Sequence, residues 1–280
     1  MGADNRPPSR ELWDLAERWL VRGWLQNHAR SKPRGYAGDH EMLARIYDAS
    51  LCADPLGQLF DRYFQAQAAP QAVRYRMQMM ADWIVETIRM RRAVSGTVAE
   101  GPVKIGIVGS AFGAELREAL RKLTESERHS LQAALLDLDP TALEYAREQL
   151  TGWLPKDRLS LSSGNLFRMA DRPSMAAPLA GSDLLFCPGL FDYFDDATAA
   201  KFLKCLVDQL APGGRLIVFQ FAPHNPTRAY MEWFGNWYLT YRDRDALRDL
   251  VQAAELTDVD VAYGSEPSGV DLFAQITRNC

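Results

Sequence analysis

The strongest constraint on the fold is an alternation of short apolar runs with longer amphipathic segments, which begins at residue 103. Strand-length apolar runs occupy residues 103–108, 130–136, 158–162, 182–187 and 214–221, and helical segments are expected at 113–122, 139–150, 197–210 and 243–254. Such alternation predicts an α/β fold, a parallel sheet with helices on both faces. Two more strands are expected near 257–262 and 272–277. The loop between them is too short for a crossover helix, so one of the two should run antiparallel.

The first hundred residues lack this alternation and are predicted to be helical. Large apolar side chains recur at helical spacing from Trp13 to Trp24, and further helices are expected at 39–50, 56–67 and 71–94. A proline and two glycines predict a loop at 32–39. The glycine-containing segment 95–102 is the best boundary. We therefore expect an N-terminal helical arm or lid at 1–100 and a ligand-binding sheet domain at 101–280.

Composition limits the classes of partner. The 32 basic and 36 acidic side chains give a net charge of −4, without the basic footprint expected for nucleic-acid binding. No apolar run approaches the roughly 18 residues of a membrane span, and the start lacks a secretory pattern, so we expect a cytoplasmic protein. The four cysteines lie far apart, which argues against structural zinc and disulfides. The first hundred residues hold 14 basic and 12 acidic side chains, a small excess that would suit an anionic small molecule.

The first strand ends in a turn with two glycines, Gly109 and Gly113. Glycines at such a turn let the backbone approach a ligand, and the N-terminus of the next helix offers unpaired N–H groups. Tight packing alone explains such a turn about half of the time. The G-x-x-x-G spacing differs from the G-x-G-x-x-G of dinucleotide sites, which argues against a nicotinamide or flavin enzyme.

The second strand ends in an acidic turn, Leu136-Asp137-Leu138-Asp139-Pro140. An acid at the carboxyl edge of a sheet can accept both hydroxyl protons of a ribose, which is the role expected for Asp137. The alternative is a merely solvated Asp137. Asp139 is expected to cap the following helix, with Pro140 at the first helical position.

Five segments together resemble the motif series of class I S-adenosylmethionine-dependent methyltransferases. They are Val-Gly-Ser-Ala-Phe-Gly-Ala-Glu (108–115), Leu-Asp-Leu-Asp-Pro (136–140), Ser-Gly-Asn-Leu (163–166), Asp-Leu-Leu-Phe-Cys-Pro-Gly-Leu-Phe-Asp-Tyr-Phe (183–194) and Leu-Ala-Pro-Gly-Gly-Arg-Leu (210–216). The resemblance covers roughly residues 102–280 and implies a Rossmann-like sheet. Segments 34–39, 189–193 and 225–232 are similar to a bacterial subgroup that includes makers of a 3-hydroxy fatty acid methyl ester signal (extracellular factor).

The resemblance implies that S-adenosylmethionine is the cofactor and gives several residues a role in binding it. Those residues are Gly109, Ser110 and Gly113 at the methionine part, Asp137 and Leu138 at the ribose, Asn165 and Leu166 at the adenine, and Pro188 and Gly189 along the methyl-transfer channel. The family usually has an acid where this chain has Asn165. Arg74 and Arg76 point to different sides of one helix, so at most one should clamp the cofactor carboxylate. We assign that role to Arg76.

Three residues are candidates for the acceptor side of the site. Tyr36 would act as a gate whose ring faces the sulfonium, with cation–π attraction of about 0.5–2 kcal/mol; alternatively it packs its loop onto the core. Tyr193 and His224 are the other candidates, although a lone histidine on a loop is more often a surface group. Aromatic residues at 230, 233, 234, 237, 238 and 241 predict a helix with a wide apolar stripe.

The main functional hypothesis is methyl transfer to the oxygen, nitrogen or carboxylate of a small molecule, in bacterial secondary metabolism or signalling. It requires no metal, nucleic acid or membrane and is compatible with a homodimer. One alternative keeps the cofactor but transfers its aminocarboxypropyl group or cyclises it with release of methylthioadenosine. Another is a non-catalytic module that binds S-adenosylmethionine.

Overall fold

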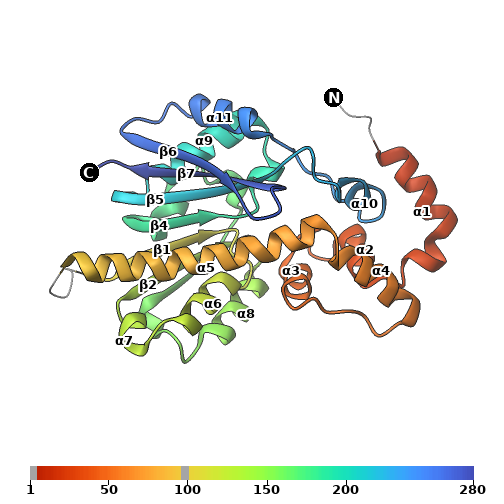
Figure 1. Ribbon diagram of the computed structural model, residues 1–280, viewed down its shortest axis with the longest axis horizontal. Helices are drawn as coiled ribbons and strands as arrows, with labels where there is room; N and C mark the ends of the chain where they lie inside the picture. The colour runs from red at the N-terminus through yellow and green to blue at the C-terminus, as the bar shows by residue number, and fades with distance from the viewer. Residues whose placement is uncertain (1–4, 96–100) are drawn as a thin grey trace.

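The strands of the described residues form a single seven-stranded sheet. The structure is a computed structural model that describes residues 5–95 and 101–280 (Figure 1). The strands are β1 (Val103–Val108), β2 (Leu131–Asp137), β3 (Leu159–Ser163), β4 (Ser182–Cys187), β5 (Leu210–Phe221), β6 (Val259–Ser265) and β7 (Asp271–Arg278). Their order is β3-β2-β1-β4-β5-β7-β6; β1 to β5 pair in parallel, and β7 is antiparallel to β5 and β6. The expected Rossmann-like sheet with an antiparallel last strand is confirmed.

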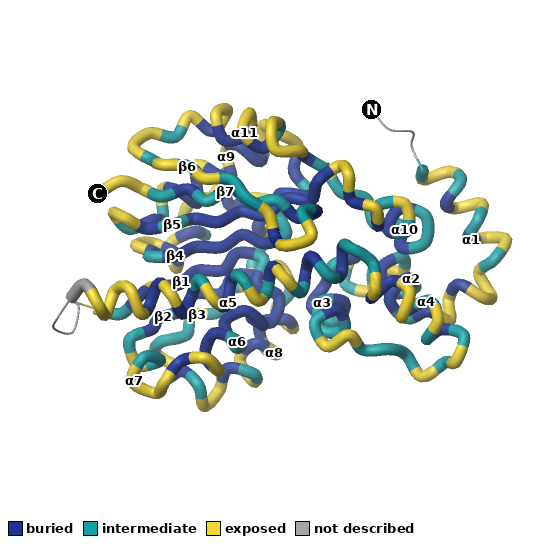
Figure 2. The backbone as a smooth tube through the Cα atoms, viewed as in Figure 1, coloured by how far each residue is buried: buried dark blue, intermediate teal, exposed yellow. Residues whose placement is uncertain are grey.

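The central strands are covered by helices on both faces. One layer holds α5 (Ala68–Ser95), α6 (Ala114–Lys122) and α8 (Pro140–Leu150), and the other holds α9 (Asp196–Val207), α11 (Arg244–Ala253) and the 3-10 helix η3 (Pro173–Leu179). On β4, Leu184 and Phe186 pack against the first layer, whereas Leu185 and Cys187 pack against the second. Figure 2 shows the central strands buried along most of their length. Because both faces are buried, such strands are apolar throughout instead of alternating with polar residues.

The helical arm has its own apolar core. The arm consists of α1 (Arg6–Leu20), α2 (Trp24–Ser31), α3 (His40–Tyr47) and α4 (Pro55–Gln65). Its core is formed by α2, α3, α4 and the start of α5, together with α10 (Arg228–Trp233) from the segment that follows β5, and α1 packs on α10. The long helix α5 joins the arm to the sheet, because Val73 packs in the arm core and Ile84 packs against the sheet. Part of the expected boundary at 95–102, residues 96–100, lies outside the described residues.

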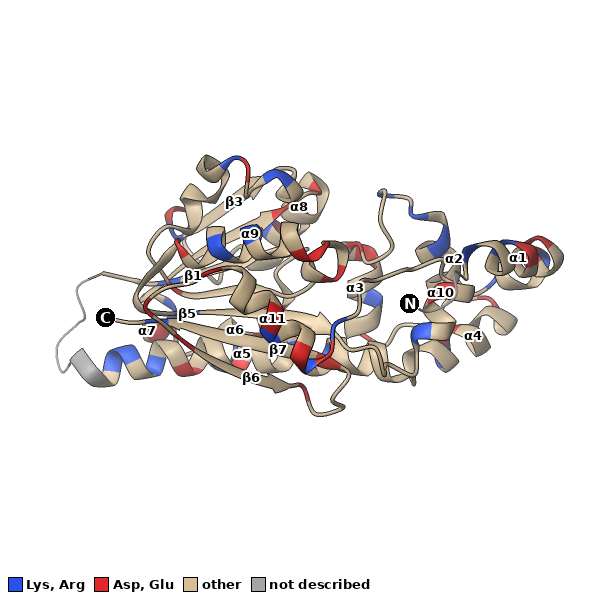
Figure 3. Cartoon of the chain, turned by 90° about the horizontal axis from the view of Figure 1, so that it is seen from above, with Lys and Arg blue, Asp and Glu red and all other residues tan. Residues whose placement is uncertain are grey.

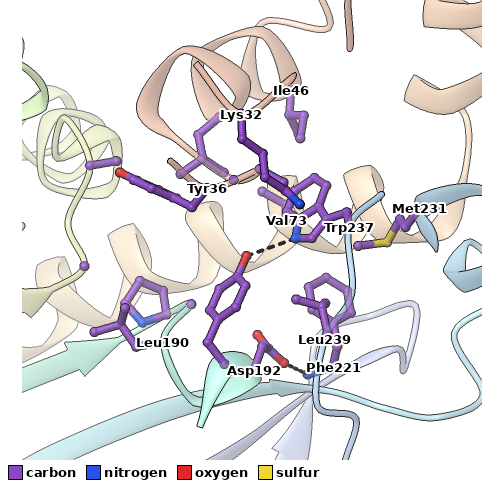
Figure 4. Close-up of a pocket in the computed structure, with 18 of the residues that line it drawn as sticks. Lys32, Tyr36, Ile46, Val73, Leu190, Asp192, Phe221, Met231, Trp237 and Leu239 are labelled. Carbon is purple, nitrogen blue, oxygen red and sulfur yellow. Dashed lines mark hydrogen bonds between the residues drawn. The ribbon is translucent and has the colours of Figure 1, made fainter. Parts of the chain in front are cut away.

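The aromatic segment between β5 and α11, residues 222–243 and here called the insert, is only partly helical. The prediction of a helix over 230–241 is therefore wrong beyond Trp233. Helix α10 ends at Trp233, and Asn236 adopts a left-handed φ of 47°, a conformation that terminates helices. Residues 236–243 have no regular structure and return along the arm toward the sheet. This path carries the Trp237 side chain into the interior, where Figure 4 shows it beside Val73.

The remaining helices are short and connect the main elements. They are α7 (Glu125–Arg128), η1 (Lys156–Arg158), η2 (Leu166–Arg168) and η4 (Phe191–Tyr193). Within residues 5–95 and 101–280, no helix has the length and apolar character needed to cross a lipid bilayer. The carboxyl ends of the parallel strands face the arm (Figure 1), which places the turns after β1, β2 and β4 beneath it.

Candidate active site

A cavity of about 810 Å³ lies between the carboxyl edge of the sheet and the arm. The sheet contributes the turns after β1, β2 and β4, and the arm contributes the loop 32–39, here called the arm loop, together with parts of α3 and α5. Residues 236–239 of the insert close a third side (Figure 4). The arm therefore covers the edge of the sheet where ligands bind in open α/β folds.

The glycine turn after β1 forms one wall. Gly109 and Gly113 have φ values of 72° and 65°, in the left-handed region that favours glycine. A Cβ on Gly113 would lie 2.8 Å from Leu135 Cδ1, so this residue packs behind the turn, whereas Gly109 and Ser110 line the cavity. The hydroxyl of Ser110 is buried and has no hydrogen-bond partner among the described residues. The turn thus presents backbone and one unsatisfied hydroxyl to a ligand.

Asp137 lies at the end of β2 and is buried against the cavity, so the merely solvated alternative does not hold. Its Oδ2 accepts a hydrogen bond from Ala111 N at 2.7 Å, and its Oδ1 accepts one from Asp139 N at 2.9 Å. Burial raises the pKa of Asp137, although both N–H groups oppose this rise. Asp139 caps α8 through a 2.8 Å hydrogen bond from Thr141 N, as expected. Each Asp137 oxygen keeps a lone pair for a ligand hydroxyl.

The other residues expected to contact the cofactor are only partly together. Leu138, Leu166, Pro188 and Gly189 line the cavity, and Phe167 joins them although the sequence did not single it out. Asn165 is exposed and does not line the cavity; its Oδ1 accepts a hydrogen bond from Phe167 N at 3.1 Å and caps η2. The structure therefore gives Asn165 a capping role at this position.

A buried charged cluster lies where the cavity meets α5 and α6. Arg76 donates to Asp271 Oδ2 at 2.7 Å, and Tyr47 donates to Glu115 Oε1 at 3.1 Å. Arg76 Nε and Glu115 Oε2 are buried without hydrogen-bond partners among the described residues, and both residues line the cavity. Arg74 instead binds the arm, with a 2.9 Å bond to Gln65 Oε1. Sequence reasoning missed Glu115, although it directly follows the Gly113-Ala114 pair of the turn.

Another wall of the cavity brings together Tyr193, Trp237 and Asp192. Figure 4 labels Trp237 and Asp192. Trp237 Nε1 donates to the Tyr193 hydroxyl at 2.9 Å, and Asp192 Oδ1 accepts from Phe221 N at 2.9 Å. The second oxygen of Asp192 accepts no hydrogen bond from the described residues. Burial raises the pKa of Asp192 to about 6, against the opposing Phe221 N–H. Sequence reasoning missed this acid, although it lies beside the predicted Tyr193.

The other two acceptor-side candidates have different surroundings. Tyr36 lines the cavity, and burial raises the pKa of its phenol well above the usual range, with Asp137 as the next cause. His224 is exposed and does not line the cavity; its Nε2 lies 3.0 Å from the Gly269 carbonyl oxygen. The structure thus separates His224 from the site. Among the described residues, no three His, Cys, Asp or Glu side chains are grouped as a metal site would require.

Comparisons with known proteins identify the fold. No protein-family model matches the chain, and no curated protein matches its sequence. A possible exported protein of Bordetella parapertussis is similar in structure, with a TM-score of 0.63 and 18% identity over 86% of this chain and 80% of that one. Magnesium protoporphyrin IX methyltransferase of Synechocystis PCC 6803, solved with bound S-adenosylhomocysteine, has a TM-score of 0.51 and 13% identity over 86% of this chain and 100% of its own.

A pyocyanin biosynthetic protein is similar over a larger share of this chain. It has a TM-score of 0.50 and 14% identity over 95% of this chain and 68% of its own. These likenesses and the strand order define the fold: the chain has the Rossmann-like sheet that class I S-adenosylmethionine-dependent methyltransferases share.

Proposed function

We propose that the protein transfers a methyl group from S-adenosylmethionine to a small-molecule acceptor. The observation that carries this proposal is one cavity, beneath the arm, that joins the Gly109 turn, the buried Asp137 and the Pro188-Gly189 turn. The S-adenosylhomocysteine bound to the Synechocystis methyltransferase supports the choice of ligand. When bound, S-adenosylmethionine supplies an electrophilic methyl group on a sulfonium.

The residues present fit this cofactor. The free lone pairs of Asp137 would accept the ribose hydroxyl protons, and Leu138, Leu166 and Phe167 would enclose the adenine. The amino-acid part carries a carboxylate and an ammonium. Arg76 and Glu115 each have a buried polar atom without a partner among the described residues. Arg76 would therefore bind the carboxylate, and Glu115 would bind the ammonium.

The acceptor would lie between the arm and the turn after β4. There Tyr36 and Tyr193 would position it, and the arm would exclude water. The free oxygen of Asp192 can receive the proton of a hydroxyl or amine acceptor. The narrower assignment, ester formation on a 3-hydroxy fatty acid in bacterial signalling, is supported by the resemblance of segments 34–39, 189–193 and 225–232. The apolar side chains of Val73, Met231 and Leu239 along the cavity agree with it.

The cofactor assignment is tested by calorimetry with S-adenosylhomocysteine. We expect Asp137→Ala to weaken binding by about 10- to 100-fold, because hydrogen bonds to a charged group are lost. Asp208→Asn, which changes an exposed acid at the end of α9, is the matched control and should bind like the parent protein. Equal affinity in all three proteins would remove Asp137 from the site.

The reaction itself is tested by mass spectrometry of incubations with S-adenosylmethionine and a panel of hydroxyl, amine and carboxylate acceptors. Methyl transfer produces S-adenosylhomocysteine and a methylated acceptor. Release of methylthioadenosine would contradict methyl transfer and indicate attack on another carbon of the sulfonium. Binding without turnover across the panel would indicate a non-catalytic module.

A further inference from the structure

The arm forms one end of the cavity, and a group of basic side chains lines that end. Arg6, Arg10, Arg30 and Lys32 all belong to it. Within the described part of the chain, Arg10, Arg30 and Lys32 form no ion pair with a carboxylate. In Figure 3, Lys and Arg residues follow one another along the segment that leaves α2. The positive charges of Arg10, Arg30 and Lys32 distinguish this end from the acidic edge of the sheet, where Asp137 and Asp192 lie.

Lys32 is the central member of this basic cluster. Its Nζ donates to the Asn236 carbonyl oxygen at 2.9 Å, which leaves two of its three N–H donors for another partner. Burial, followed by the charges of Arg30 and Arg6, lowers the pKa of Lys32. Holding a half-buried ammonium beside other cations is unfavourable unless an anion compensates.

Two arginines of the cluster are fixed by aromatic rings. The Arg30 guanidinium stacks at 4.3 Å on the Trp13 ring and donates to Ser9 Oγ at 3.1 Å, so it joins α2 to α1. The Arg6 guanidinium lies 4.5 Å from the centre of the Tyr238 ring. Ring stacking holds a guanidinium in place while its edges remain able to donate hydrogen bonds. The cluster is therefore preorganised by three segments, α1, α2 and residues 236–238.

The basic cluster and the site of methyl transfer lie at different ends of the cavity. Figure 4 shows Lys32 entering from the arm and Asp192 on the sheet side, with Trp237 between them. The contacts run in the same order, from Lys32 to Asn236, the neighbour of Trp237, and from Trp237 to Tyr193. Apolar side chains such as Val73, Met231 and Leu239 line the space between.

We propose that the arm-side end of the cavity binds an anionic group of the acceptor, a carboxylate or a phosphate, away from the atom that is methylated. This inference rests on the proposed function and narrows its acceptor. The acceptor has an apolar body, a nucleophilic atom near Tyr193 and Asp192, and an anion at Lys32. A 3-hydroxy fatty acid methylated on its only carboxylate would leave this basic cluster without an anion. The inference therefore favours an acceptor with a second, unmethylated anionic group over the narrower assignment to that fatty acid.

The test measures binding of simple amphiphiles to the full-length protein by calorimetry and by the fluorescence of Trp237 and its neighbours. The probes are decanoate, decyl phosphate and the uncharged decanol. We expect Lys32→Gln to weaken binding of the preferred anionic probe about 10-fold, because a charge-assisted hydrogen bond is lost. The affinities of Lys32→Gln for decanol and for S-adenosylhomocysteine should not change. Lys32→Arg should bind the anionic probe as the parent protein does.

The matched control is Lys104→Gln. Lys104 is exposed on β1, and its Nζ also donates to a single carbonyl, that of Ala180 at 3.4 Å. Equal anion affinity in the Lys32 and Lys104 variants, or decanol binding as tightly as both anions, would overturn the inference. Whichever of decanoate and decyl phosphate binds with the higher affinity identifies the preferred anionic group. Lys32-dependent anion binding without any S-adenosylhomocysteine binding would overturn the proposed function and leave the anion site in place.

Discussion

At the scale of single residues, Asp192 combines burial, with 3% of its surface exposed, and a carboxylate oxygen that accepts no hydrogen bond from the described residues. Its Oδ1 accepts hydrogen bonds from Gln220 Nε2 at 2.7 Å and from Phe221 N at 2.9 Å, which tie the turn after β4 to the end of β5. Asn at this position keeps an oxygen for both donors and removes the charge. Asp192→Asn is therefore a suitable variant to separate ionisation from structure.

We expect this variant to change how stability depends on pH. Burial raises the pKa of Asp192 from 3.8 to about 6, so between these values the folded protein binds more protons and its stability falls as pH rises. In Asp192→Asn this fall in stability is absent, because asparagine does not ionise. Relative to the parent, its free energy of unfolding should increase by about 3 kcal/mol from about pH 3.5 to about pH 7.

Urea unfolding at the two pH values measures this difference. Asp208→Asn, at the exposed position directly after α9, controls for the loss of one carboxyl group. A stability difference between the Asp192 variant and the parent that is the same at both pH values would show that Asp192 ionises as freely as an acid in water.

At the scale of elements, strands could be predicted from sequence where burial on two faces makes them apolar. This holds for β1 and β4, and the Gly109 and Asp137 turns follow because each lies at a strand end. The path of residues 236–243 could not be predicted, because aromatic spacing suited a helix and only packing against the arm decided otherwise. The Lys32 contact with Asn236 likewise joins residues 204 positions apart, so it depends on how the arm docks.

The arm loop is held over the Asp137 side of the cavity by Arg34. Its Nη1 donates to Asp139 Oδ2 at 3.2 Å and to Thr141 Oγ1 at 2.5 Å, and its Nη2 donates to Glu41 Oε1 at 2.6 Å. Asp139 lies two residues after Asp137, so these contacts close the loop beside the proposed ribose site. Opening the loop for ligand exchange would break the contacts with Asp139 and Thr141.

Removing this closure should speed the release of ligand. Because exposed ion pairs are each worth up to about 1 kcal/mol, we expect Arg34→Gln to raise the dissociation rate of S-adenosylhomocysteine about 5- to 10-fold. Stopped-flow displacement measures the rate. Arg62→Gln, on the exposed side of α4, should leave it unchanged. An unaltered rate in the Arg34 variant would mean that ligand leaves by another route.

At the scale of the whole molecule, the arm and the sheet share one long helix. Helix α5 places Ala72 and Val73 in the arm core, and Ile84 and Ile88 in a sheet core with Phe186. The insert carrying α10 leaves β5 and packs back into the arm core through Met231. Two covalent connections and a common helix therefore couple the parts, although their sequences divide near residue 101.

This coupling predicts that the arm and the sheet unfold in one transition. Tryptophan fluorescence reports mainly on the arm and the insert, which hold Trp13, Trp19, Trp24, Trp233 and Trp237, whereas far-ultraviolet circular dichroism reports on the whole chain. In urea, both signals should change at the same midpoint. Because the cavity needs both parts, S-adenosylhomocysteine at about 100 times its dissociation constant should raise the unfolding free energy by about 2.7 kcal/mol in both signals. A fluorescence midpoint below the dichroism midpoint, or a ligand shift confined to the dichroism, would show that the arm opens independently of the sheet.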